Sequence, residues 1–352
     1  MTTNCDCRNL GPDSLVLGIE TSCDETSASV LRGGEEILSL VTATQDHLHA
    51  AFGGVVPEVA SRRHVEVITQ VVRDALAAAG VSWADLALIA VTQGPGLVGS
   101  LLVGVSAAKG YALACNLPLV AVNHLEGHLL AAFVHAPGEA PAAQEVYPTL
   151  GLIASGGHSD LVLMPAPGEY QTVGQTRDDA AGEALDKAAR LLGLPYPGGP
   201  HLERAAAGGN PAAVSFPRPV APDFDYSFSG LKTALRRHVE QHGPPPSPAT
   251  LADVAASYQQ AVVDSLARQL ERAARHYQAR QLVLGGGVAA NRALRAACAR
   301  VGRAWGAPVA CPPPALCTDN AACIAAAGFR QAVRQGPSGL DFDVFSVLPL
   351  GG

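Results

Sequence analysis

One pattern that occurs twice constrains the fold more than any other feature of this sequence. In each half, two short apolar runs flank a turn of small or polar residues, and a later apolar run leads through glycines into a helix. The first copy comprises residues 15–19, 26–31, 88–91 and 97–114, and the second comprises residues 149–154, 160–164, 281–284 and 292–301. Apolar runs of this length, bounded by turn residues, are typical of buried strands. The repeat predicts a duplicated α/β domain with its ligand in the cleft between the halves.

The length of the chain agrees with two domains. With 352 residues, of which 48% are hydrophobic, it can bury two ordinary cores. Proline, alanine and glutamate are frequent in residues 136–148, which favours a linker. We therefore expect a disordered tail at 1–14, a first lobe at 15–135, the linker at 136–148, a second lobe with a helical insertion at 149–335, and a C-terminal tail at 336–352.

Two histidines follow an apolar run at residues 119–122. Asn123 is a good helix N-cap, and His124 and His128 come next with a spacing of i and i+4. On a helix this spacing places both imidazoles on one face, where they can share a metal ion or be ordinary surface or core histidines. The sequence does not decide between these interpretations. A zinc-protease HExxH arrangement is excluded, because Leu125 holds the place of the glutamate.

Acidic residues occur at two further places of interest. The turn after residue 19 contains Glu20, Asp24 and Glu25, which are either solvated or placed near a phosphate and a metal. Thr318 is the expected N-cap of an alanine-rich helix with Asp319 in its first turn, and Asp319 is either a plain capping acid or a metal ligand. The turn Gly94-Pro95-Gly96 is likewise either a phosphate cradle or a tight turn without a ligand.

Charge and composition limit the functional class. The net charge of −7 argues against a generally basic nucleic-acid binder, although a local basic groove remains compatible with it. We see neither an apolar signal core nor a run of about 20 apolar residues, so we expect a cytoplasmic protein without a membrane partner. The cysteines form no C-x-x-C pair and are expected to be reduced thiols. Cys5 and Cys7 could bind a metal, but an unstructured tail is the favoured interpretation.

Ten motifs in order resemble one family, the tRNA N6-adenosine threonylcarbamoyltransferases, formerly called O-sialoglycoprotein endopeptidases. The match covers residues 15–335, and two departures are an asparagine at 123, where a second histidine is frequent, and Ala154 in place of valine. The motifs are GIETSCDET (18–26), GGVVPEVASRRH (53–64), GPGLVGSLLVG (94–104), NHLEGHLL (123–130), SGGHSDL (155–161), DDAAGEALDK (178–187), PYPGGP (195–200), YSFSGLKT (226–233), GGGVAANRALR (285–295) and CTDNAA (317–322).

The resemblance implies a fold and a reaction. The fold is an α/β architecture of two duplicated actin/Hsp70/sugar-kinase-like (RNase H-like) lobes around a nucleotide cleft. The reaction moves a threonylcarbamoyl group from threonylcarbamoyl-AMP to N6 of the adenosine 3′ of the anticodon, in tRNAs that read codons beginning with A, and releases AMP. The implied partners are tRNA, an inactive paralogue that forms a heterodimer, and a small P-loop ATPase.

The resemblance also implies site residues. One iron or zinc ion per subunit is expected on His124, His128 and Asp319, with the ligands drawn from the two halves. From the chemistry of the reaction, and not from the resemblance, we infer that Asp24 and Glu25 could position or deprotonate the attacking amine. The implied contacts to threonylcarbamoyl-AMP or AMP are Ile153, Ala154, Ser155, Gly156, Gly157, Asp186, Gly199 and Asn291.

Other functions remain to be weighed against this one. A sugar kinase or ATPase of the same fold would leave the histidine pair unexplained. A scaffold paralogue should lack that pair and Asp319, and a peptidase is disfavoured by the position of Glu126. The helix expected from Pro57 to Ala79 carries two apolar stripes, and the second, which includes Val67 and Val71, is either core or a docking surface for the paralogue.

Overall fold

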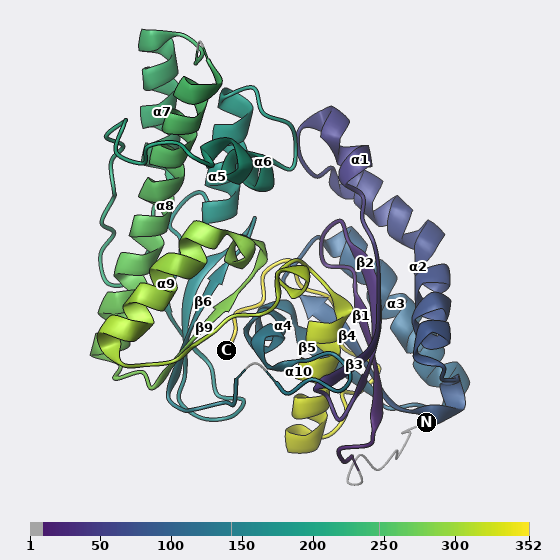
Figure 1. Cartoon of the computed structure of the whole chain (residues 1–352). Helices are drawn as coiled ribbons and strands as arrows, with labels where there is room; N and C mark the ends of the chain where they lie inside the picture. Colours follow the sequence, from purple (N-terminus) through teal and green to yellow (C-terminus); the bar gives the residue numbers. More distant parts are fainter. Residues whose placement is uncertain (1–9, 142, 246, 352) are drawn as a thin grey trace. The chain divides into compact units, whose positions relative to one another are not determined.

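The computed structural model describes residues 10–141, 143–245 and 247–351, and it divides into two compact units. Met1–Gln144 and Thr318–Gly352 form the first unit, and Glu145–Cys317 form the second (Figure 1). The expected assignment of residues up to 335 to the second lobe differs from this division. Helix α10 (Ala321–Gln335) packs against β1, β2 and β4 and therefore belongs to the first unit. Cys5 and Cys7 lie outside the described residues.

The first unit is built on a five-stranded sheet with the order β3-β2-β1-β4-β5. Strand β1 is antiparallel to β2 and parallel to β4, and β5 is parallel to β4. These strands read as near-continuous apolar runs because helices cover both faces of the sheet. Their bounds are β1 Leu15–Glu20, β2 Thr26–Arg32, β3 Glu36–Ala43, β4 Leu86–Gly94 and β5 Leu119–Asn123.

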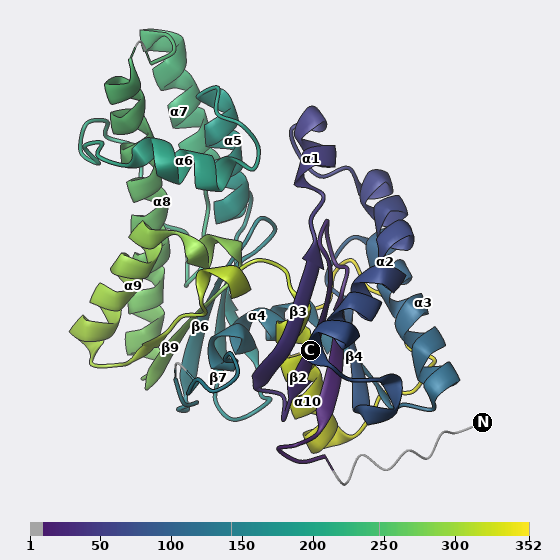
Figure 2. The same cartoon turned by 45° about the vertical axis from the view of Figure 1, so that its right-hand side comes forward.

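Helices α2 (Pro57–Ala79) and α3 (Val98–Cys115) pack on one face of this sheet, and α10 packs on the other (Figure 2). Leu17 and Ile19 point into the core on the α2 and α3 side, whereas Gly18 faces α10. A Cβ at Gly18 would lie 2.2 Å from the carbonyl oxygen of Ala321, so only glycine permits this close packing. The remaining helices of this unit are short: α1 Asp46–His49 and α4 His124–Leu130.

The second unit repeats the strand order of the first. Its sheet runs β10-β9-β6-β7-β8, with β6 antiparallel to β7 and parallel to β9. Each strand thus has a counterpart in the first sheet, and the predicted duplication is confirmed. The strands are β6 Thr149–Ala154, β7 Ser159–Met164, β8 Gln171–Gly174, β9 Gln281–Gly285 and β10 Val309–Ala310; the helices are α5 Ala181–Leu191, α6 Gly198–Ala206, α7 Ser229–His242, α8 Pro248–His276 and α9 Arg292–Trp305.

The predicted start of helix α10 is wrong. Asn320, not Thr318, caps α10, because its side-chain oxygen accepts a hydrogen bond from the backbone N–H of Cys323. Asp319 therefore precedes the helix and is no first-turn acid. The turn at Gly94 and Gly96 is packed against other backbone: an added Cβ would lie 2.3 Å from the oxygen of Phe345 or 2.6 Å from that of Ser22. This close packing of backbone against backbone explains why both positions are glycine.

The apolar stripes of α2 are divided between core and surface. Val71 is 5% exposed and belongs to the core cluster, whereas Val65 is 65% exposed. Of the two alternatives left open for the second stripe, the core holds for Val71, because α2 turns this side toward β2 and β3, and Val67 packs partly buried against the same cluster.

Within the described residues one helix, α3, is long and apolar enough to cross a membrane by length and composition alone. Val105, Ala108 and Ala112 of α3 belong to the core cluster of the first unit, and core helices meet the same criterion.

Candidate metal centre

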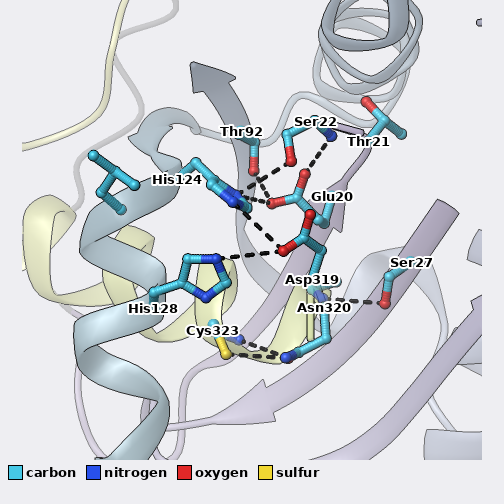
Figure 3. Close-up of polar contacts among 12 residues, drawn as sticks. Glu20, Thr21, Ser22, Ser27, Thr92, His124, His128, Asp319, Asn320 and Cys323 are labelled. Atoms are coloured by element: carbon cyan, nitrogen blue, oxygen red, sulfur yellow. Dashed lines mark hydrogen bonds and ion pairs between the residues drawn. The ribbon is translucent and has the colours of Figure 1, made fainter. Parts of the chain in front are cut away.

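The two histidines are positioned by the junction of β5 and α4. Strand β5 ends at Asn123, whose Oδ1 accepts a hydrogen bond of 2.9 Å from the backbone N–H of Leu125. This cap starts the helix at His124, so His124 and His128 share one face, with their ring centroids 4.5 Å apart. Both side chains are buried, and their rings point toward Asp319 (Figure 3).

Asp319 joins the two histidines from the segment that precedes α10. Its Oδ1 lies 3.3 Å from Nε2 of His128 and 3.6 Å from Nε2 of His124. The ligand atoms of the three residues all lie within 4.8 Å of one another. All three belong to the first unit, so the expectation that the two halves share the ligands is wrong.

The donor set fits a transition metal. Ligands bonded to one ion at about 2.0–2.2 Å are separated by roughly 3–3.5 Å, close to the distances between Asp319 and the histidines. Nε2 of His128 is buried and makes no hydrogen bond within the described residues, although it lies 3.3 Å from the carboxylate of Asp319. A buried nitrogen without a hydrogen bond is costly, and a bound cation would remove this cost.

Glu20 completes the centre; the sequence placed it among three acids that are either solvated or near a phosphate and a metal, but did not predict its contact with His124. Its Oε2 lies 3.0 Å from Nδ1 of His124 and accepts a hydrogen bond of 2.7 Å from Oγ1 of Thr92. The backbone N–H of Ser22 donates to its other oxygen (Figure 3). With Nδ1 of His124 donating to the carboxylate, the lone pair of Nε2 is directed away from Glu20 and is available to a metal. A carboxylate at the end of the buried run LVLGIE was the available signal, since buried acids require partners.

The charges of Glu20, His124 and Asp319 shift the pKa values of His124 and Glu20. Burial by itself would lower the pKa of His124, but the carboxylates of Asp319 and Glu20 outweigh burial and raise that pKa to about 9. Burial would raise the pKa of Glu20, but His124 outweighs burial and the pKa lies below its usual value. The carboxylates therefore favour a positive charge at this position, whether it is a proton or a metal ion.

Asp24 and Glu25 lie in the turn between β1 and β2. Asp24 is buried and Glu25 is half-buried. Burial raises the pKa of the Glu25 carboxyl well above its usual value, and the charges of Asp319 and Asp24 raise it further. The turn is fixed by His64 of α2, whose Nδ1 lies 2.7 Å from Oγ1 of Thr26 and whose Nε2 lies 2.9 Å from the carbonyl oxygen of Cys23.

The expected phosphate turn lies in the second unit, at the end of β6. Ile153 and Ala154 are buried within the strand, so any ligand contact there is made by the backbone. Ser155 follows the strand, and its Oγ accepts a hydrogen bond of 3.1 Å from the backbone N–H of His158. Gly156 and Gly157 are exposed, and an added Cβ at either would meet open space.

Asp186, Gly199 and Asn291 have partners within the second unit. Oδ1 of Asp186 accepts a hydrogen bond of 2.9 Å from the backbone N–H of Gly199, and burial raises the Asp186 pKa. Asn291 caps α9 by accepting from Leu294, and its Nδ2 donates to Gln259 at 2.8 Å.

Each sheet has the same strand order, and a His-His-Asp cluster lies on the first unit. Together these features define the class: an actin/Hsp70/sugar-kinase-like fold with a candidate metal site. Solved structures share this fold. Component A of (R)-2-hydroxyglutaryl-CoA dehydratase from Acidaminococcus fermentans matches with a TM-score of 0.53 and 16% identity over 91% of this chain and 99% of that chain. Full-length HypF in its phosphate- and nucleotide-bound form matches with a TM-score of 0.59 and 12% identity over 93% of this chain and 47% of that chain.

Sequence comparison identifies the family. The model of the TsaD family, tRNA N6-adenosine threonylcarbamoyltransferase, matches residues 36–326. The enzyme of that name from Anaeromyxobacter dehalogenans is 55% identical over 93% of this chain and 97% of its own length. Its namesake from a Geobacter species is 50% identical over 96% of both chains. The chain belongs to the tRNA N6-adenosine threonylcarbamoyltransferase family, as its motifs indicated.

Proposed function

We propose that this chain transfers the threonylcarbamoyl group of threonylcarbamoyl-AMP to N6 of the adenosine 3′ of the anticodon, in tRNAs that read codons beginning with A. Membership of the family supports this reaction. The observation that carries the proposal is the pair of buried histidines, His124 and His128, with the half-buried Asp319, because neither a sugar kinase nor a non-enzymatic scaffold requires this set.

The proposed metal is iron or zinc, held by His124, His128 and Asp319. When bound, such an ion supplies a Lewis acid and open positions for donor oxygens. Glu20 and Ser22 keep Nε2 of His124 directed at that position through their contacts with Nδ1. Thr92 in turn holds the carboxylate of Glu20.

The second unit is proposed to bind the nucleotide half of the donor. Backbone N–H groups of Ser155, Gly156 and Gly157 suit a phosphate, because glycine leaves room for close approach. Asp186 is suited to a ribose hydroxyl pair, and Gly199 leaves space for the adenine plane, since a Cβ there would meet nothing within 4 Å. Asn291 at the start of α9 and the β6 backbone at Ile153 and Ala154 complete the proposed contacts.

Asp24 and Glu25 are proposed to position the acceptor amine and remove its proton. In this step the N6 amine attacks the carbamoyl carbon, a C–N bond forms, and the C–O bond to the phosphate breaks. AMP leaves with the electron pair, and the proton of the amine passes to a carboxylate. The proposal rests on location, because both residues share a turn with Glu20 and Ser22, which contact His124.

The family resemblance supports two protein partners and a compartment for this reaction. We propose an inactive paralogue that docks on the first unit, and a small P-loop ATPase that joins the complex, in the cytoplasm. Their substrate would be tRNA, on which the named relatives act.

The decisive experiment joins metal analysis with tRNA nucleoside analysis. Protein purified without chelators should contain one iron or zinc per chain, and His128→Ala should lose it. The matched control is His47→Ala, since His47 is exposed and no proposed ligand. In a strain depleted of the chromosomal enzyme, the wild-type chain and the His47 variant should restore threonylcarbamoyladenosine in tRNA, and the His128 variant should not. Restoration by His128→Ala would exclude the proposed centre.

A further inference from the structure

The C-terminal tail packs against the first unit like an additional strand. Leu340, Phe342 and Val344 pack against the core cluster, whereas Asp341 and Asp343 are exposed. This alternation is typical of an extended segment with one face on a core. Apolar side chains therefore help to hold the tail on the core of the first unit. The tail falls outside both the motif resemblance and the family match at residues 36–326.

Backbone contacts lead the tail to the carboxyl ends of β4 and β5. Ser338 donates its N–H to the oxygen of Leu119 at 2.8 Å, where β5 begins. Lys109 of α3 donates to the oxygen of Phe342 at 2.6 Å and lies 4.3 Å above its ring centroid. Phe345 then donates to the oxygen of Gln93 at 3.0 Å, near the end of β4.

The side chain of Asn123 connects the tail to helix α4, which carries His124 and His128. Its Nδ2 donates to the carbonyl oxygens of Leu348 at 3.2 Å and Pro349 at 3.3 Å. Its Oδ1 caps α4 through Leu125. One amide group therefore holds the tail on one side and, on the other, the first turn of the helix that begins with His124.

A second path leads from the tail to the same histidine. Gly96 donates its N–H to the oxygen of Ser346 at 3.3 Å, and Leu97 donates to the oxygen of Ser22 at 2.8 Å. Oγ of Ser22 lies 3.3 Å from Nδ1 of His124. Both paths end at His124, and the orientation of its ring decides whether its Nε2 can bind a metal.

We propose that residues 345–350 form a strap that positions His124 in the metal centre, acting through the side-chain amide of Asn123. The proposal rests on the metal centre proposed above. Helix α4 has only 7 residues, and a helix this short is not stable in isolation. Its first residue is also the one most prone to fraying. Helix α10 packs against α4, and the strap adds a further hold at the start of α4 through Asn123.

Two variants test the strap. A chain that ends at Val344 keeps the three tail residues packed on the core but loses the strap. Asn123→Ser keeps a helix-capping oxygen but lacks an amide that reaches Leu348 and Pro349. We expect both to bind zinc about 10–100-fold more weakly in chelator competition, as when other partners of metal ligands are removed. Hydrogen exchange in α4 should accelerate, while exchange in α5 of the second unit stays unchanged.

A chain lacking only Gly351 and Gly352 is the matched control and should bind zinc with wild-type affinity. Wild-type affinity in Asn123→Ser would overturn the strap, and so would wild-type affinity in a soluble chain ending at Val344. If the shortened chain is insoluble, Asn123→Ser decides alone. Failure of the wild-type chain itself to bind metal would instead contradict the proposed function.

Discussion

Oε2 of Glu20 lies 3.0 Å from Nδ1 of His124, and both side chains are buried. Glu20 ends β1, and His124 begins α4 after β5. Strand β4 lies between β1 and β5 in the sheet, so the contact forms only after both parallel pairings are made. The metal centre is thus coupled to completion of the first sheet.

Glu20→Gln should weaken metal binding about 10–100-fold, because a neutral amide polarises His124 less and can present the wrong group to Nδ1. Chelator competition measures this change. Glu36→Gln is the control, since Glu36 pairs with Arg32 on the surface at 2.7 Å and is remote from the centre. Equal affinities in the two variants would show that Glu20 does not orient the ligand.

Asp186→Ala should reduce the rise in melting temperature that AMP produces, without unfolding the chain. A ligand that binds only the folded state stabilises it by mass action, by about 2.7 kcal/mol at 100 times its Kd. Differential scanning fluorimetry at several AMP concentrations measures this effect. Glu271→Ala, which removes an exposed partner of Arg275, is the control. An undiminished rise in Asp186→Ala would place the ribose elsewhere.

Asp160→Asn should stabilise the second unit at pH 8. Burial, helped by the charge of Asp225, raises the pKa of Asp160 to about 6, and the residue is 8% exposed. The folded state therefore binds the proton more tightly than the unfolded state, and stability falls as pH rises from about 4 through 6. A folded-state pKa about 2 above the unfolded one makes the ionised carboxylate cost about 3 kcal/mol of stability at pH 8.

Thermal unfolding of Asp160→Asn at pH 4 and pH 8 measures this difference. The variant should gain over the wild type at pH 8 and gain little at pH 4. Asp341→Asn is the control, since Asp341 is exposed in the tail. A gain of equal size at both pH values would mean that ionisation of Asp160 is not its cause.

The substitutions Val71→Glu and Val65→Glu compare the buried side of α2 with its exposed side. Val71 is 5% exposed, so a glutamate there buries an unpaired charge and should cost about 3–5 kcal/mol of unfolding free energy. Val65 is 65% exposed, and its substitution should change that free energy by about 0.5 kcal/mol or less. Urea unfolding distinguishes the two.

The same pair tests the proposed docking of a paralogue. Val65→Glu should remain folded and metal-bound but lose association with the paralogue in size-exclusion chromatography, if the exposed side of α2 is the docking surface. Retained association would move that surface away from α2. Ser61→Ala, a smaller change on the same helix, provides the control.

Local sequence determined the features that depend on neighbouring residues. The spacing of His124 and His128 places them on one helical face, and Pro57 and Gly80 bound α2 as predicted, with Gly80 in the left-handed conformation at φ 68°. The twofold recurrence of strand patterns predicted the duplicated fold, because each copy must bury its own apolar runs. The motifs indicated the family.

Tertiary structure alone decided which distant residues meet. The return of the chain to the first unit brings Asp319 to the histidines, and the strand pairings bring Glu20 to His124. The orientation of α2 against the sheet buries Val71 and exposes Val65. The tail reaches Asn123 by the same kind of packing. Helical and strand periodicities act over a few residues, whereas these contacts depend on how whole elements pack, which no local pattern specifies.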